Sequence, residues 1–226
     1  MRKIALTCLL ALPLFAGFFP QTVQTTVSDV TENTVTLNHA FPVNGMSGVI
    51  VHNYGNDLQA ITGRIEQQSP HSIKQLSHDV IHHENLPTIK TPISVGDKVI
   101  GGYLYENVLL LAPNAKTYAK ITASSNKNWI HPDIFALFLA KQGDQVPTKS
   151  NLRNFAKTYQ VGLIYIVNNG SAKLLDPISG KTVGTKVLSN LPAKGEAPFF
   201  MRFDEIESGM FSLSNKQNFY DIMSQL

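Results

Sequence analysis

The stretch Gly45–Arg64, GMSGVIVHNYGNDLQAITGR, decides the fold of the first half of the chain. It begins with an apolar run at Val49–Val51, followed by turn-forming residues at Asn53–Asp57 that tolerate a positive φ, and then a second extended pattern. Two strands joined by such a turn form a β-hairpin. Gly45 and Gly48 precede the first strand, where a missing Cβ suits a bulge or a close crossing of two backbones. We therefore predict a hairpin within a small, closely packed β-structure.

Short strand patterns extend in both directions from this hairpin. Valine and threonine recur with a period near two across residues 21–37, which predicts another hairpin. A turn followed by a strand is expected over residues 95–105, with a returning strand at Val108–Leu111 and a closing strand at Tyr118–Thr122. No helical pattern is evident in this half. We predict that residues 17–123 form a small all-β barrel or sandwich.

The pattern changes after the polar stretch Ser124–Asn128, which we interpret as a linker between two domains. His131 precedes a proline and an apolar helical face, and Thr148 is a good N-cap for a second helix over residues 149–160. The other expected elements are strands at Val161–Val167, Ala172–Leu175, Val183–Leu188 and Phe199–Phe203 and a last helix at Gln217–Met223. Residues 129–226 are thus predicted to be α+β, with two helices packed on a mainly antiparallel sheet.

The first 16 residues have the layout of a secretory signal peptide. Arg2 and Lys3 precede an apolar run from Ile4 to Phe15, and the small residues Ala16 and Gly17 follow it. The run is too short to span a bilayer comfortably, and no later segment approaches that length. We expect cleavage near Ala16 and export to the periplasm or the cell surface, without a transmembrane segment in the mature chain.

Composition narrows the classes of function. Cys8 is the only cysteine and lies inside the apolar run, so the mature chain is expected to contain no disulfide. Only seven residues precede Cys8, too few for a lipoprotein signal. Loss of Arg2 and Lys3 lowers the formal net charge from +3 to +1. With no long block of charge, the chain is not expected to bind nucleic acid.

A histidine-rich run is the first candidate for a metal site. His78, His82, His83 and Glu84 offer imidazole and carboxylate groups, which are common metal ligands. The flanking residues are strand-like, no fourth ligand is evident, and the spacing matches no metal motif. We therefore interpret the run as a solvated polar edge and predict no metal site.

His131 and Asp133, at the start of a predicted helix, are candidates for proton transfer. Neither a nucleophile nor oxyanion donors accompany them, whereas helix capping explains both residue types at this position. The sequence also contains no phosphate-binding loop, nucleophile elbow or zincin helix. We predict no catalytic residues and no cofactor, and hence not an enzyme.

Several long stretches together resemble one protein family. They are GMSGVIVHNYGNDLQAITGR, VGDKVIGGYLYENVLLLAPN, WIHPDIFALFLA, PTKSNLRNFAKTYQVGLIY and FDEIESGMF, in this order. They resemble the N-terminal domain of the bacterial plasminogen-binding surface proteins, and the likeness covers most of the mature chain. The resemblance implies a protein partner, host plasminogen, captured through lysine side chains. In that family a C-terminal lysine is expected to matter most, and this sequence ends in Leu226.

Binding of plasminogen would therefore have to use internal lysines. The candidates are Lys127 in the expected linker, Lys194 beside Glu196, and Lys216 before the last helix, all in segments expected to be mobile. A lysine followed closely by an acid imitates the cation and carboxylate pair that a kringle accepts, and Lys194-Gly195-Glu196 comes nearest to it. Two alternatives stay open: a periplasmic or envelope component that binds no plasminogen, and an enzyme, against which the missing catalytic groups argue.

Overall fold

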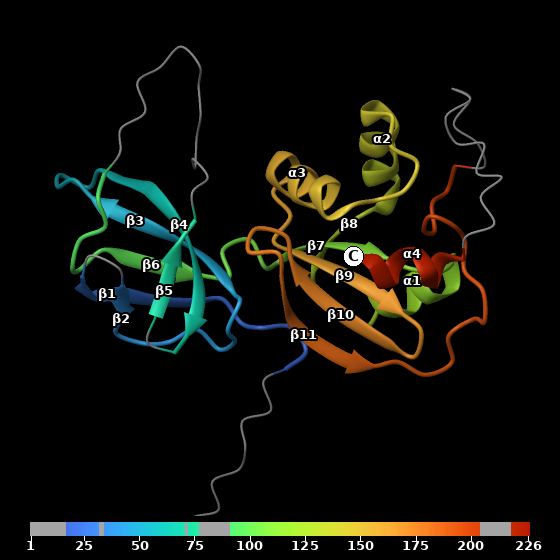
Figure 1. Ribbon diagram of the computed structural model, residues 1–226, viewed down its shortest axis with the longest axis horizontal. Coiled ribbons are helices and arrows are strands. Elements are labelled where there is room, and N and C mark those ends of the chain that lie inside the picture. Colours follow the sequence, from blue (N-terminus) through green and yellow to red (C-terminus); the bar gives the residue numbers. More distant parts are fainter. Residues whose placement is uncertain (1–16, 32–33, 71, 77–90, 204–217) are drawn as a thin grey trace, which may run out of the picture.

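A computed structural model describes residues 17–31, 34–70, 72–76, 91–203 and 218–226. Two lobes lie side by side along the long axis of the molecule (Figure 1). One lobe is a β-barrel from the N-terminal half of the chain, and the other is a mixed sheet with four helices among the described residues. The fold is therefore α+β, as the sequence predicts.

The N-terminal lobe is a closed barrel with the strand order β1-β2-β5-β4-β3-β6. The barrel closes because β6 pairs antiparallel with both β1 and β3. Of the two predicted architectures, barrel and sandwich, the barrel is correct. Its strands are β1 (Val23–Val30), β2 (Val35–Leu37), β3 (Ser47–Asn53), β4 (Gln59–Ser69), β5 (Ser72–Gln75) and β6 (Lys98–Gly101).

The predicted central hairpin is confirmed as β3 and β4, which pair antiparallel with a register shift after Ile50. Its turn contains Gly55, Asn56 and Asp57, all with positive φ, as expected for residues that tolerate the left-handed region. Gly48 provides the close backbone crossing, because a Cβ there would lie 2.8 Å from the carbonyl oxygen of Ile100 on β6. The glycine thus lets β3 and β6 approach at the barrel wall.

The second lobe is built on a five-stranded sheet with the order β11-β10-β9-β7-β8. The pairs β9–β10 and β10–β11 are antiparallel, whereas β7 is parallel to both β8 and β9. The sheet is therefore mixed rather than mainly antiparallel. Its strands are β7 (Asn107–Leu111), β8 (Asn128–Ile130), β9 (Leu163–Asn168), β10 (Ser171–Asp176) and β11 (Lys181–Val187), and its helices are α1 (Ala115–Thr122), α2 (Pro132–Gln142), α3 (Lys149–Tyr159) and α4 (Phe219–Gln225).

Of the predicted strands, one forms but pairs elsewhere than expected, and two do not form. Val108–Leu111 does not return along the barrel strand before it; it forms β7 of the second sheet, where all four side chains are buried. Tyr118–Thr122 is the end of helix α1, whose first turn is capped by the side chain of Asn114. Phe199–Phe203 is irregular. A short apolar run has no reliable period, so its partner in the fold decides its conformation.

Residues 124–127 lie between α1 and β8, and Asn128 is the first residue of β8. The strand before α1, β7, belongs to the same sheet as β8. The stretch therefore connects two elements of the second lobe. The chain passes from barrel to second sheet earlier, between β6 and β7.

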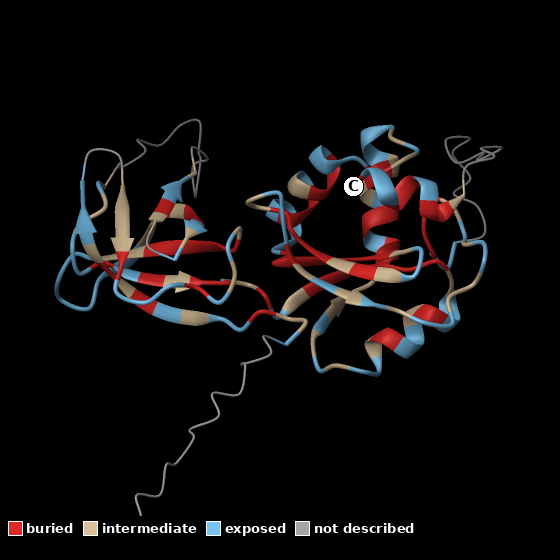
Figure 2. Cartoon of the chain, turned by 60° about the horizontal axis from the view of Figure 1, so that its bottom comes forward, coloured by how far each residue is buried: buried red, intermediate tan, exposed pale blue. Residues whose placement is uncertain are grey.

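The predicted helices α2 and α3 are confirmed, together with their ends. The side chain of His131 caps α2, which ends at Gly143 in the left-handed region. Thr148 caps α3 in a reciprocal capping box with Asn151. Figure 2 shows buried residues concentrated in the strands and on the inner faces of these helices, where the apolar faces of α2 and α3 cover the sheet.

Candidate functional site

Lys194 and Glu196 lie on the segment between β11 and α4, with both side chains exposed. The backbone between them is anchored. The amide of Glu196 donates to the carbonyl oxygen of Pro113 (2.8 Å), and a Cβ on Gly195 would lie 2.7 Å from both Pro113 and Phe219. The structure thus presents a cation and a carboxylate, two residues apart, from a backbone that is fixed against the lobe.

The surroundings of Glu196 also affect its ionisation. Although the side chain is exposed, neighbouring protein partly desolvates the carboxyl, which raises the pKa of Glu196 above its ordinary value. An approaching cation would favour the charged form and oppose this shift.

Lys127 has a different environment. Its side chain is only 13% exposed, its Nζ lies 2.6 Å from the Oε1 of Glu106, and it also lies 5.3 Å from the ring centroid of Phe19. This ammonium group is therefore largely buried and already paired, which makes it less accessible to a partner than an exposed, unpaired lysine. Lys216, the remaining candidate, lies outside the described residues.

His131 and Asp133 are held in structural roles. The backbone amide of Asp133 donates to the Nδ1 of His131 (3.2 Å), which confirms capping. The carboxylate accepts from the backbone amide (2.9 Å) and the Nε (2.7 Å) of Arg202. Burial alone would raise the pKa of Asp133, but the Arg202 hydrogen bonds and the positive charges of His131 and Arg202 outweigh it and lower this pKa. Burial lowers the pKa of His131. Both groups are engaged in fixing the start of α2.

The histidine-rich run at residues 78–84 lies outside the described residues. Within the described ranges, no group of three or more His, Cys, Asp or Glu side chains is arranged to hold a metal ion. No helix in this part of the chain combines the length and apolar character needed to cross a membrane.

The two lobes are joined by a fully buried carboxylate, which the sequence analysis did not single out. The Oδ2 of Asp176, at the end of β10, accepts from the amide of Ser47 on β3 (2.8 Å) and from the hydroxyl of Tyr105 (2.6 Å). The Oδ1 accepts from the amides of Ile178 and Ser179. Burial, the charge of Asp176 and this hydrogen bond raise the pKa of the Tyr105 hydroxyl. Every donor is satisfied, so Asp176 stabilises the junction.

The backbones of the two lobes also meet directly. A Cβ on Gly162, just before β9, would lie 2.0 Å from the carbonyl oxygen of Leu104, in the segment that leaves the barrel. A Cβ on Gly45 would lie 2.7 Å from the Cβ of Lys181 on β11. Only glycine permits these approaches, which bring β3 of the barrel against the second lobe.

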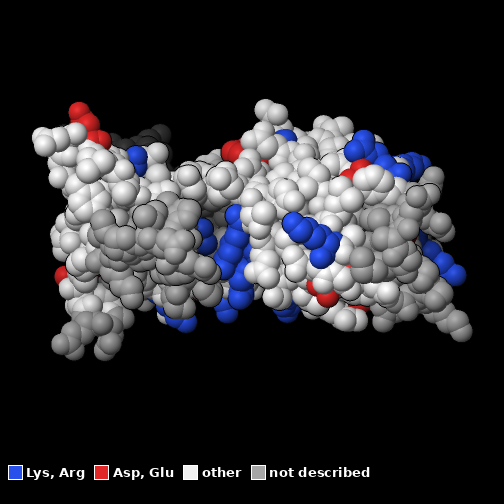
Figure 3. All heavy atoms as spheres, turned by 90° about the horizontal axis from the view of Figure 1, so that it is seen from above, with Lys and Arg blue, Asp and Glu red and all other residues white. Residues whose placement is uncertain are grey.

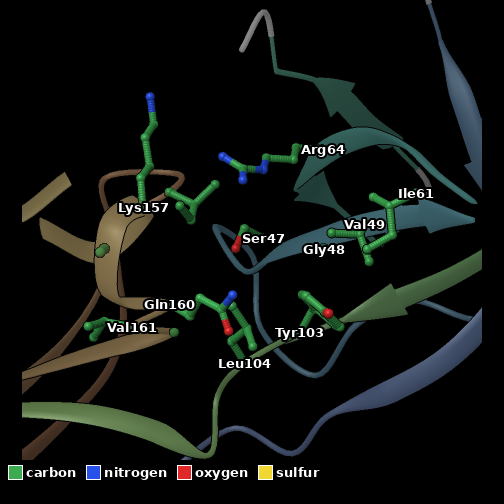
Figure 4. Close-up of a pocket in the computed structure, with 13 residues that line it drawn as sticks. Ser47, Gly48, Val49, Ile61, Arg64, Tyr103, Leu104, Lys157, Gln160 and Val161 are labelled. Carbon is green, nitrogen blue, oxygen red and sulfur yellow. The ribbon is translucent and has the colours of Figure 1, made fainter. Parts of the chain in front are cut away.

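A cleft of about 220 Å³ opens beside this junction, between β3 and β4 of the barrel and the C-terminal end of α3 (Figure 4). Its apolar lining includes Val49, Ile61 and Val161, and its cations are Arg64 from β4 and Lys157 from α3. The guanidinium of Arg64 points from the barrel toward α3, while the Lys157 side chain extends from α3 toward the top of this view, away from the other labelled residues. Figure 3 shows that Lys and Arg side chains gather at the junction of the two lobes.

The cleft cations were missed in the sequence analysis, although part of the signal was present. Arg153 and Lys157 are four residues apart in the predicted helix and so lie on one face of it. The approach of Lys157 to Arg64, about ninety positions earlier in the chain, depends on the packing of the lobes.

Comparisons with known proteins agree with the resemblance in the sequence. The family described as "Plasminogen-binding protein pgbA N-terminal" matches residues 22–224. The plasminogen-binding protein PgbA of Helicobacter pylori strain J99 is 30% identical over 142 residues, and so is that of strain 26695. Each match covers 60% of this chain and 31% of the relative, so the chain matches less than a third of their length. No solved structure matches the chain. Because the family match spans almost all of the sequence, the chain belongs to the PgbA N-terminal family.

Proposed function

We propose that this chain is an exported, non-enzymatic binding protein that captures plasminogen through Lys194 and Glu196. The observation that carries the proposal is an exposed lysine and an exposed acid two residues apart, on an anchored loop, in a member of a family named for binding plasminogen. A kringle that accepts a cation and a carboxylate together finds both groups there.

The anchored backbone changes the expected energetics. A mobile loop would lose backbone freedom on docking, whereas here the contacts of Gly195 and Glu196 with Pro113 and Phe219 have already ordered it. The remaining entropic cost is that of the two side chains, about 0.5 to 1.5 kcal/mol each. We therefore expect weaker binding than a terminal lysine would give, but stronger binding than a disordered internal pair. Lys216 remains a proposed second contact, whereas Lys127 is a poorer one because it is paired with Glu106.

Export is supported by the position of the first packed residues. Phe18 packs against Tyr165 of β9 with ring centroids 5.2 Å apart, and Phe19 packs against Trp129 at 6.3 Å. Cleavage near Ala16 would leave both aromatic contacts intact. Mass spectrometry of the protein recovered from cells should show an N-terminus between Gly17 and Gln21. Recovery with Met1 in place would contradict export by this route.

The alternative is an envelope component that does not bind plasminogen. The limited extent of the match favours this alternative. The aligned region covers only 31% of each PgbA relative, so the plasminogen binding for which they are named can reside elsewhere in those proteins.

The deciding experiment is binding of the purified chain to immobilised plasminogen, with and without a soluble lysine analogue. We expect binding that the analogue abolishes and that Lys194→Ala weakens about tenfold, as for loss of a charged contact. Lys141→Ala, at an exposed lysine near the end of α2, is the matched control and should bind like the unmodified chain. Tight binding that the analogue does not affect would refute the lysine mechanism. No binding at high concentration would favour the envelope component.

A further inference from the structure

The cleft between the lobes concentrates positive charge from two separate parts of the fold. Arg64 comes from the barrel, and Lys157 lies on α3 one turn after Arg153. Burial lowers the pKa of Lys157, and the charges of Arg64 and Arg153 lower it further, so both arginines are close enough to repel the Lys157 ammonium group.

Among the residues that the structure describes, no carboxylate forms an ion pair with these cations. The ion pairs of the described residues involve His52, Lys127, His131 and Arg202, and none involves Arg64, Arg153 or Lys157. The Nε of Arg153 is buried and has no hydrogen-bond partner in the described part of the chain. Asp176, the buried acid of the junction, already accepts four hydrogen bonds. Like charges brought together without a counter-charge cost stability, so they are expected where an anion binds.

The rest of the lining indicates the kind of anion. The cleft has a volume of about 220 Å³, which is enough for a few side chains of a ligand. Apolar side chains, among them Val49, Ile61 and Leu104, line it together with the cations. An apolar surface next to a guanidinium suits an acidic side chain with an apolar neighbour in the same peptide, because the guanidinium fork can pair with a carboxylate in bidentate geometry.

We propose that the cleft between the lobes binds an acidic peptide segment of a partner protein, with a carboxylate held by Arg64 and Lys157 and an adjacent apolar side chain in contact with Val49 and Ile61. The site is separate from the Lys194 loop, and it has the opposite preference: the loop offers a lysine to its partner, whereas the cleft accepts an acid. Its test does not involve plasminogen.

The test measures fluorescence anisotropy of a labelled peptide in which two glutamates flank a leucine, added to the purified chain. We expect saturable binding that weakens as the salt concentration rises, because the ligand is held by charge. The same peptide with glutamine in place of glutamate should not bind. Arg64→Gln and Lys157→Gln should each weaken binding about tenfold, while Lys74→Gln, at an exposed lysine of β5 outside the cleft, should leave it unchanged.

Two further measurements identify the kind of anion that binds and check that the variants are folded. Acetate and inorganic phosphate compete with the peptide; tighter binding of free phosphate than of the glutamate peptide would overturn the assignment to a peptide carboxylate. Because Arg64 is half-buried, thermal unfolding checks that each variant folds, and Lys157→Gln provides a second variant at an exposed side chain. Failure of the peptide to bind, or equal affinity of the unmodified chain and both cleft variants, would overturn the proposal.

Discussion

The junction between the lobes contains two polar regions of opposite character. At Asp176 a buried acid accepts four hydrogen bonds from residues of both lobes. Arg64 and Lys157 line the adjacent cleft, and Arg153 lies one turn before Lys157 on α3. None of the three has an ion-pair partner among the described residues. The first arrangement stabilises the protein because every buried group is satisfied, whereas the second only adds repulsion. The comparison suggests different roles: Asp176 stabilises the fold, whereas the cations beside it can bind a ligand.

The largest expected effect comes from removing the satisfied acid. Asp176→Ala would leave the amide of Ser47 and the hydroxyl of Tyr105 buried without an acceptor, at about 1–3 kcal/mol each. We expect a loss of about 4 kcal/mol in the free energy of unfolding, measured by urea denaturation. Asp29→Asn, at an exposed position of β1, is the control and should change stability by less than about 0.5 kcal/mol. A small effect of Asp176→Ala would mean that the lobes do not depend on this contact.

The close approach of the backbones should be nearly as sensitive. Gly162→Ala would place a Cβ 2.0 Å from the carbonyl oxygen of Leu104, so the lobes must separate or the strand must shift. We expect a loss of about 2–3 kcal/mol, seen as a lowered Tm. Gly63→Ala is a matched control within the barrel, because the nearest atom to its Cβ would be 3.6 Å away. Equal Tm values for the two variants would contradict the described packing of the lobes.

A satisfied acid at the edge of the second lobe should give a smaller, pH-dependent effect. The pKa of Asp133 is lower in the folded protein than in the unfolded chain, so its contribution to stability is present above the ordinary carboxyl pKa and is lost as the pH falls through the lower folded value. Arg202→Ala removes the Nε hydrogen bond and should cost about 1 kcal/mol at neutral pH.

This cost should disappear in acid, where the carboxyl is protonated in both variants. Urea denaturation at neutral and acidic pH measures the difference. A cost that stays constant with pH would show that Arg202 acts through packing rather than through the charge of Asp133.

The smallest expected effect has the opposite sign. Lys157→Gln removes one of the mutually repelling cations and should raise stability by about 0.2–0.5 kcal/mol at low salt, with a smaller gain at high salt. The measurement is the Tm at two salt concentrations, compared with Lys74→Gln on the barrel. Destabilisation by Lys157→Gln would show that this cation has a structural partner, and would weaken the contrast with Asp176.

Helices and strands could be predicted from the sequence where turn and capping residues mark their ends. The hairpin around Asn53–Asp57 forms because its turn residues accept a positive φ, and α3 begins at Thr148 because a hydroxyl there caps the first turn. By contrast, Val108–Leu111 is apolar at every position and carries no period. Its sequence is compatible with a strand in either lobe. Its parallel pairing with β9, which the sequence does not reveal, places it in the second sheet.

The candidate sites divide in the same way. Lys194-Gly195-Glu196 was recognisable from the sequence because a cation and an acid two positions apart stay close in any conformation. The anchoring of that loop by Pro113 and Phe219, and the pairing of Lys127 with Glu106, required contacts between distant parts of the chain. The cleft could not be predicted from the sequence, because Arg64 and Lys157 come from different lobes and meet only when the lobes pack together.

The sequence by itself determined the α+β class, the central hairpin, the caps of α2 and α3 and the family, because each depends on residues near one another in the chain or on long matching stretches. The tertiary structure alone decided the closure of the barrel, the parallel pairing of β7 and the meeting of Asp176 with Ser47 and Tyr105. These features join residues far apart in sequence. Their free energy comes from burial and hydrogen bonding that exist only once both lobes have formed.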